Sequence, residues 1–511
     1  MNNHKYKILV LCLLIFIQDI YPQKTKFMMP YPVIVELSRL DEAYQILDQF
    51  SKNVWDSWDD YMNFPFLFSF QNGLRVLVGH PNPPPVFVPF PDLFVHGLKV
   101  YIDTTNLNDF IIKLPILCGG GPISFGSFNN RHVTAVEITC RTQTSLQVPN
   151  FSTAEYNILA FIHELMHCYQ ANILKDQYPN LEINPDFNFA LFGDIEGKAL
   201  AKSYEQPNYE ASIPFLKDFC IARILKIKYL TQDEKNSYEC VEFSEGEAVY
   251  SEFTILQNIK KGFISCSSIK NDTTYKRFQN IEDYMAFYLN MLKSSTGNTL
   301  NLYDKNYWYG CFQAILLQTY FPGWQRELEN GKWLDQILQE RISITGLDSL
   351  NSLHRFREIY HLDSLKTEHE TRITVRNETY KKLQSQKGRI YIIDFKPIRQ
   401  LLSSSVNISK KNFELGLINM YPDGLGDLKF DKVSISFKPV LTEINQLYYV
   451  KLIDAKSKES KKPYKINYES KDDKGFYYNV IVTTPLFELK APKITIIKST
   501  NRIKFVIHSR V

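Results

Sequence analysis

Two histidines and a glutamate form the most informative short pattern in this chain of 511 residues. Residues 161–170 contain His163, Glu164 and His167, which make an HExxH sequence. In a helix, residues four positions apart lie on one face, so both imidazoles can bind a single metal ion. Zinc binds neutral imidazole nitrogen readily and keeps one position open in catalytic sites. Glu164 borders the same cleft and can accept a proton from a water molecule.

The surroundings of this pattern predict a buried helix. Ser152 and Glu155 have the spacing of a capping box, and apolar positions recur from there to about residue 174. An HExxH sequence arises by chance in about one chain in a hundred of this size. Two histidines and a glutamate are costly to bury unless they are paired or bind a metal. We therefore expect a zinc site here; the alternative is a pair of core histidines with Glu164 in a salt bridge.

A third protein ligand is required, and two later glutamates are candidates. The metzincin pattern does not fit, because Gln170 and Ile173 occupy the positions where it places Gly and His. Glu196 opens an EGxA run and is separated from His167 by 28 residues, whereas 77 residues separate His167 from Glu245. The shorter separation favours Glu196, and the longer one requires an inserted pair of helices.

A second segment resembles the glutamate helix of gluzincin metallopeptidases, the thermolysin-like and aminopeptidase-like group: Glu245-Gly246-x-Ala248-x-Tyr250. In that group, HExxH supplies two zinc ligands and the glutamate that opens EGxAxY supplies the third. The resemblance implies Zn2+ on His163, His167 and Glu245, with Glu196 as the alternative third ligand. It covers the two short runs and, loosely, the order of a sheet, an active-site helix and a glutamate helix.

Other residues have supporting roles in this hypothesis. Glu242 lies one turn before Glu245 and could orient a ligand histidine. The oxyanion needs a donor besides the metal, and the resemblance makes tyrosine and arginine candidates. We select Tyr250 and Tyr307 as the catalytic candidates beside Glu164. Two further candidates are Tyr309 and Arg223.

Three functions are consistent with these residues. The first is a metallopeptidase with a peptide or protein substrate, in which Glu164 is the general base. The second is a zincin-fold binding or structural protein without turnover, although such a protein would have no use for Glu164. The third is a metallohydrolase that cleaves a non-peptide amide bond. The residues alone indicate a zinc hydrolase, and fold-level analogy adds the peptidase.

The wider sequence predicts an α+β protein in three parts. Residues 1–23 have the charged start and short apolar run of a secretory signal, so we expect a secreted or extracytoplasmic protein. Residues 24–384 should form a zincin-like domain, an N-terminal sheet followed by a mostly helical region. Residues 385–511 should form a smaller β-rich domain, joined through a linker at 379–387.

Sequence periodicity places the individual elements. In the first domain, strands are expected at 64–70, 74–79, 98–103 and 132–139, and residues 81–91 are expected to be a proline-rich loop. Helices are expected at 33–62, 152–174, 188–203, 213–229, 235–258, 280–293, 306–320 and 330–341. In the last domain, strands are expected at 389–395, 432–440, 447–453, 476–484 and 494–507.

Charge and cysteine content narrow the possible partners. The net charge is only +4, from 59 basic and 55 acidic residues, which gives no support for nucleic-acid binding. No later segment is long and apolar enough for stable membrane insertion once the signal is removed. Seven cysteines follow the predicted signal, an odd number, so at least one thiol is unpaired or pairs between chains.

Overall fold

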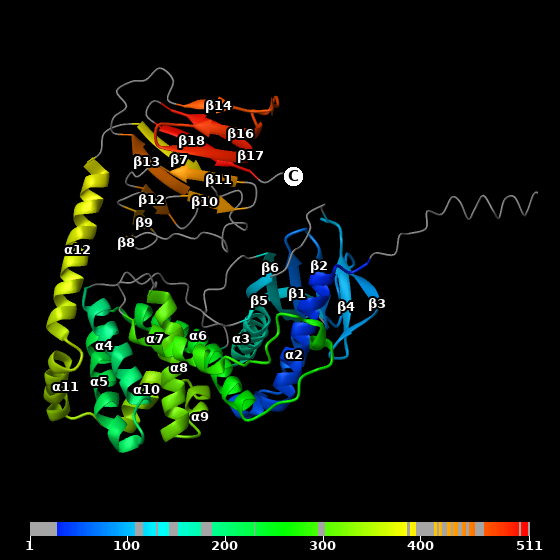
Figure 1. Cartoon of the computed structure of the whole chain (residues 1–511). Helices are drawn as coiled ribbons and strands as arrows, with labels where there is room; N and C mark the ends of the chain where they lie inside the picture. The colour runs from blue at the N-terminus through cyan, green and yellow to red at the C-terminus, as the bar shows by residue number, and fades with distance from the viewer. Residues whose placement is uncertain are drawn as a thin grey trace, which may run out of the picture.

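The computed structural model describes residues 28–107, 116–128, 131–142, 152–174, 187–228, 230–294, 302–385 and 389–394. In the last part of the chain it describes residues 413–415, 418–421, 427–430, 433–437, 442–445, 449–454, 464–499 and 502–508. The predicted signal at 1–23 lies outside the described residues. Within them, eleven α-helices and two sheets make a mixed fold, which confirms the α+β class (Figure 1).

The first sheet has six strands in the order β3-β4-β2-β1-β6-β5. Their bounds are β1 Phe66–Phe70, β2 Arg75–Val78, β3 Val88–Val95, β4 Leu98–Asp103, β5 Ile116–Phe128 and β6 Arg131–Thr142. The expected hairpin of β1 and β2 is confirmed, with Gly73 at a φ of 83° in its turn. All neighbouring strands are antiparallel except β1 and β6, which are parallel.

One prediction for this sheet was wrong, and one strand was missed. Pro89 and Pro91 lie in β3 rather than in a loop. This strand is at the sheet edge, where a residue without an N–H can be accommodated. Strand β5 was not predicted, because Gly119, Gly120 and Gly121 weaken its strand pattern. Pairing with β6 along most of its length holds it in the sheet.

Helices α2 to α8 include the segments that carry the candidate site. Their bounds are α2 Tyr31–Val54, α3 Thr153–Leu174, α4 Phe187–Tyr204, α5 Tyr209–Ile227, α6 Gln232–Lys260, α7 Ile281–Lys293 and α8 Leu302–Tyr320. The first helix ends eight residues before the predicted position 62, because Trp55 adopts an extended conformation. None of the described helices is long and apolar enough to cross a membrane.

The remaining helices are α9 Gln325–Glu329, α10 Leu334–Ile342, α11 Gly346–Glu358 and α12 Leu362–Ser385. The helix predicted at 330–341 was wrong at its start, because Gly331 has a φ of 90° and separates α9 from α10. Most of the stretch 379–387, predicted to join the two domains, belongs to α12, which continues to Ser385 and runs from the helical region toward the second sheet (Figure 1).

The second sheet is formed by strands from residue 389 onward and has its own hydrophobic core. The strands are β7 Arg389–Asp394, β8 Phe413–Leu415, β9 Ile418–Tyr421, β10 Asp427–Phe430, β11 Val433–Phe437, β12 Thr442–Asn445, β13 Tyr449–Asp454, β14 Lys465–Asn467, β15 Ser470–Lys471, β16 Tyr477–Thr483, β17 Phe487–Lys498 and β18 Arg502–Ile507. The single strand predicted at 494–507 is instead an antiparallel hairpin of β17 and β18.

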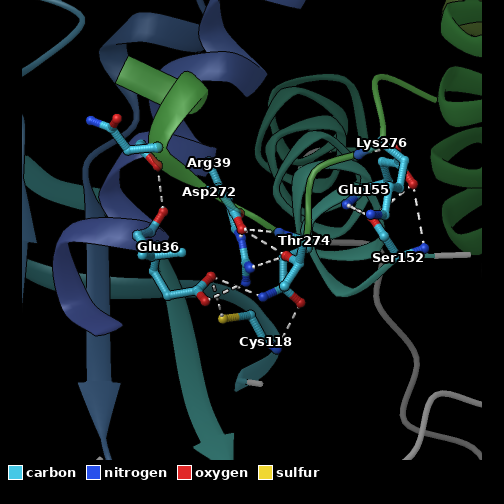
Figure 2. A network of polar contacts seen from close by, with 12 residues as sticks. Glu36, Arg39, Cys118, Ser152, Glu155, Asp272, Thr274 and Lys276 are labelled. Atoms are coloured by element: carbon cyan, nitrogen blue, oxygen red, sulfur yellow. Dashed lines mark hydrogen bonds and ion pairs between the residues drawn. The ribbon is translucent and has the colours of Figure 1, made fainter. Parts of the chain in front are cut away.

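Buried polar contacts hold α3 in place. Ser152 and Glu155 form the predicted capping box, with the Ser152 hydroxyl accepting from the Glu155 N–H at 3.2 Å. Oε2 of Glu155 accepts in return from the backbone N–H and the hydroxyl of Ser152. Oε1 accepts from the backbone N–H groups of Lys276 and Phe278, at 3.0 and 2.6 Å. Figure 2 shows this contact beside a second one, in which Arg39 joins Asp272 at 2.7 Å. The segment between α6 and α7 is thereby fastened to both α2 and the start of α3.

Candidate metal centre

Helix α3 presents both histidines of the HExxH sequence on one face. Their ring centroids are 4.7 Å apart and the rings are nearly perpendicular, at 84°. Glu245, from the middle of α6, approaches both rings: its Oε2 lies 3.5 Å from Nε2 of His163 and 3.4 Å from Nε2 of His167. Among the described residues, these three form the group whose ligand atoms are close enough to share one metal ion.

The spacing of these atoms fits a tetrahedral metal. Ligand atoms at the usual zinc distances of 2.0 to 2.2 Å lie about 3.4 Å apart at the corners of a tetrahedron. The two nitrogen–oxygen separations match that length. The side chains of His163, His167 and Glu245 are 12%, 9% and 13% exposed, so solvent reaches the group. The residues present therefore fit a metal with three protein ligands and one open position.

Glu252 orients the imidazole of His163. Its Oε1 lies 2.7 Å from Nδ1 of His163, so the carboxylate accepts the Nδ1–H and leaves Nε2 with its lone pair toward Glu245. The hydroxyls of Tyr284 and Tyr288, on α7, both donate to Oε2 of Glu252, at 2.5 and 2.6 Å. Burial and the charge of Glu252 raise the pKa of both tyrosines, which keeps them protonated as donors.

Gln170 orients His167 in a similar way. Its amide nitrogen donates to the backbone oxygen of Ser244 at 2.9 Å, so its amide oxygen faces Nδ1 of His167, also at 2.9 Å. The imidazole therefore carries its proton on Nδ1, and Nε2 is available to a metal. Both histidines thus present the same nitrogen toward Glu245.

The carboxylates also act on the charge of the imidazoles. Burial alone would lower the pKa of His163, but the hydrogen bonds to Glu245 and Glu252 outweigh it and raise the pKa well above its ordinary value. Burial likewise acts to raise the pKa of Glu245, and the two histidines outweigh it and hold that pKa far below its usual range. The site therefore stabilises positive charge between its carboxylates.

Glu164 lies beside this group with one oxygen free. Its Oε2 is buried and makes no hydrogen bond to any described residue. A Cβ atom added to Gly121 of β5 would lie 4.0 Å from that oxygen. Strand β5 is the outermost strand of the described sheet beyond β6, so its backbone borders the carboxylate. Glu164 thus presents an unbonded carboxylate oxygen between the histidines and Gly121.

The approach of α6 to α8 brings a tyrosine to the histidines. A Cβ atom at Gly246 would overlap Gly310, and one at Gly310 would overlap the backbone oxygen of Glu242, so the two helices cross with their backbones in contact. Tyr307 lies one turn before Gly310. Its ring stacks on that of His163, with centroids 6.1 Å apart and an interplanar angle of 15°.

The structure places Glu196 in a buried ion-pair cluster. One of its oxygens pairs with Arg223 and the other with Lys226. Arg223 also pairs with Glu242 at 2.6 Å, and the second oxygen of Glu242 accepts from Gln313. Both oxygens of Glu196 are thus paired with buried cations. The prediction that Glu242 orients a histidine was wrong, because its carboxylate faces Arg223 instead.

Two of the tyrosine candidates have structural surroundings. Tyr250 lies five residues after Glu245, on a different side of α6, and its ring packs edge-on against Trp324 with centroids 5.8 Å apart. The hydroxyl of Tyr309 donates to the backbone oxygen of Gly193 at 2.5 Å. Of the catalytic candidates selected from the sequence, Glu164 and Tyr307 therefore lie beside the histidines, and Tyr250 does not.

Sequence reasoning missed Glu252, Tyr284 and Tyr288. A signal for Glu252 exists, because seven residues after Glu245 is two helical turns and hence the same face of α6. Nothing local to the sequence links α7 to that face.

Comparison of the chain with protein-family models, curated proteins and solved structures finds no match.

Proposed function

We propose that this chain is a zinc-dependent metallopeptidase of the gluzincin type. The observation that carries the proposal is the group of His163, His167 and Glu245, with its tetrahedral spacing, beside a buried and unpartnered oxygen of Glu164. The zincin-like nature of the first domain is part of the same proposal, and it is supported by the order of sheet, HExxH helix and glutamate helix along the chain.

Zinc held by these three side chains would polarise a carbonyl group and lower the pKa of a water molecule to about 7. Glu164 accepts the proton of the attacking water on its free oxygen and then donates it to the departing amine. Glu252 and Gln170 keep both Nδ1 atoms protonated throughout, so the ligand nitrogens do not change. Tyr307 flanks His163 and is the tyrosine positioned to donate to a developing oxyanion.

The edge strand β5 favours a peptide substrate over another amide. It is the last strand of the described sheet, and its Gly121 lies beside the free oxygen of Glu164. An extended peptide would pair with such an edge through its own backbone, and this would bring a peptide bond to the carboxylate. Together with the predicted signal at 1–23, the proposal is of a secreted or extracytoplasmic enzyme that acts on a peptide or protein.

The experiment compares the wild-type chain with Glu164→Gln and with Glu282→Gln, an exposed matched control. Metal content is measured by elemental analysis after zinc loading, and cleavage by mass spectrometry of a mixed peptide library. All three proteins should bind one zinc per chain. Hydrolysis should fall at least about 100-fold in Glu164→Gln only, because the general base alone is lost.

Three results would contradict the proposal. If the loaded wild-type protein contains no zinc, the metal site is wrong. If it contains zinc and Glu164→Gln cleaves peptides as fast as the wild type, the assigned general base is wrong. Zinc binding without cleavage of any peptide in the library would remove the peptidase and leave a metal-binding protein.

A further inference from the structure

Cys118 and Cys140 lie opposite each other in the first sheet. Strands β5 and β6 are antiparallel, and their register pairs these two residues directly. The two sulfur atoms are 2.8 Å apart, and both side chains are buried, at 2% and 1% exposure. Both are free thiols in this structure.

This juxtaposition has the geometry that a disulfide requires. Residues directly opposite in an antiparallel pair have Cα atoms about 4.5 or 5.5 Å apart. Disulfides connect Cα atoms about 4.4 to 6.8 Å apart. The sulfurs already point at each other, so the bond can form without movement of either strand. A disulfide between these two residues would involve none of the other five cysteines that follow the predicted signal.

We propose that Cys118 and Cys140 are a modification site that closes to a disulfide between β5 and β6. The oxidant is the disulfide of a thiol–disulfide exchange donor. One cysteine thiolate attacks a donor sulfur and forms a mixed disulfide; the second thiolate then displaces the donor. The two cysteines lose two protons and two electrons, and the donor disulfide is reduced to a dithiol. Because both sulfurs are buried in the folded chain, the exchange takes place during folding.

The bridge would fasten the edge strand where it meets the helices. The backbone N–H of Cys118 donates to Asn157 of α3 at 3.1 Å, and its sulfur lies 3.4 Å from Glu36 of α2. Glu36 in turn accepts from Asn157 at 2.8 Å and pairs with Arg39 at 2.5 Å (Figure 2). Three residues beyond Cys118, Gly121 borders Glu164. A bridge at this point therefore holds the strand that forms one wall of the candidate centre.

The test is peptide mapping of the full chain, produced in a host whose cytoplasm is kept oxidising and purified without reductant. Free thiols are alkylated in denaturant before trypsin digestion. The cuts separate the two cysteines, since residues 114–131 carry Cys118 and residues 132–141 carry Cys140. Most chains should yield these peptides linked, and reduction should separate them. Residues 218–223 carry Cys220 and should be alkylated without reduction.

A Cys140→Ser variant serves as the matched control. In it, Cys118 should become alkylated, and the linked peptide should disappear. The proposal is overturned if both cysteines are alkylated in most wild-type chains, or if Cys118 is linked to any other cysteine. Because the mapping uses neither metal nor activity, its outcome is independent of the proposed peptidase function.

Discussion

Replacing Glu252 by glutamine tests how His163 is positioned. The substitution keeps the shape of the side chain but removes its charge and gives it a donor group. The carboxylate accepts from His163 on one oxygen, at 2.7 Å, and from Tyr284 and Tyr288 on the other, at 2.5 and 2.6 Å. An amide has only one oxygen. Either the imidazole N–H or the two hydroxyls must therefore face the NH2 group of the glutamine.

The size of the effect follows from that conflict. A buried donor left without an acceptor costs about 1 to 3 kcal/mol. Loss of the group that orients a metal-binding histidine typically weakens metal affinity about 10- to 100-fold, which corresponds to about 1.4 to 2.8 kcal/mol. The two estimates agree. We expect the zinc Kd of Glu252→Gln to rise by one to two orders of magnitude.

The assay is competition for zinc against a chromogenic chelator at neutral pH, with circular dichroism to show that each apoprotein is folded. Tyr288→Phe is the matched control, because it removes one donor and leaves the charge of Glu252 in place, so its Kd should change less. Glu282→Gln should bind as the wild type does. A folded Glu252→Gln protein with a Kd within about twofold of wild type would refute the positioning role.

Three further predictions concern the rest of the fold. Glu245→Gln should lose zinc in elemental analysis, whereas Glu196→Gln should keep it. Glu196→Gln should instead lose about 3 to 5 kcal/mol of unfolding free energy in urea, because two buried cations lose their partner. Zinc loss only in Glu196→Gln would reverse the assignment of the third ligand. Gly310→Ala should destabilise the protein by about 1 to 3 kcal/mol, since its Cβ would overlap α6. Gly346→Ala, with open space around it, should not, and equal urea midpoints for the two variants would refute the close helix crossing. Burial raises the pKa of Glu36 from 4.5 to about 7. The folded chain therefore holds that proton more tightly than the unfolded chain, and this contribution to stability is present below pH 4.5 and lost as the pH rises to about 7. The loss is up to about 3 kcal/mol, and urea titrations at several pH values should show that Glu36→Gln lacks this slope.

Short-range patterns in the sequence were sufficient to predict α3, the helix that carries the HExxH sequence. The spacing of His163 and His167 places both rings on one face of any helix, and Ser152 with Glu155 marks where that helix begins. The α+β class and most helix positions follow from the same kind of local periodicity. What the sequence left open was the third ligand, because Glu196 and Glu245 both begin similar runs.

Features that depend on distant partners were not predictable. Strand β5 exists because β6 pairs with it, despite the glycines at its centre. The prolines of β3 are compatible with a strand only because that strand lies at the sheet edge. Tyr284 and Tyr288 matter only because α7 lies against the outer oxygen of Glu252. Each of these depends on which segments meet, and no local pattern records that.

Charge compensation separates the two candidate ligands more sharply than motif or spacing does. The carboxylate of Glu196 lies between two buried cations, so it requires no further positive charge. Glu245 and Glu252 instead face the two nitrogens of His163, and Glu164 keeps a free oxygen nearby. Buried carboxylates this close to one another are costly unless positive charge lies between them. A divalent ion at Glu245 would supply that charge, which is why the geometry favours a metal centre there and a structural ion pair at Glu196.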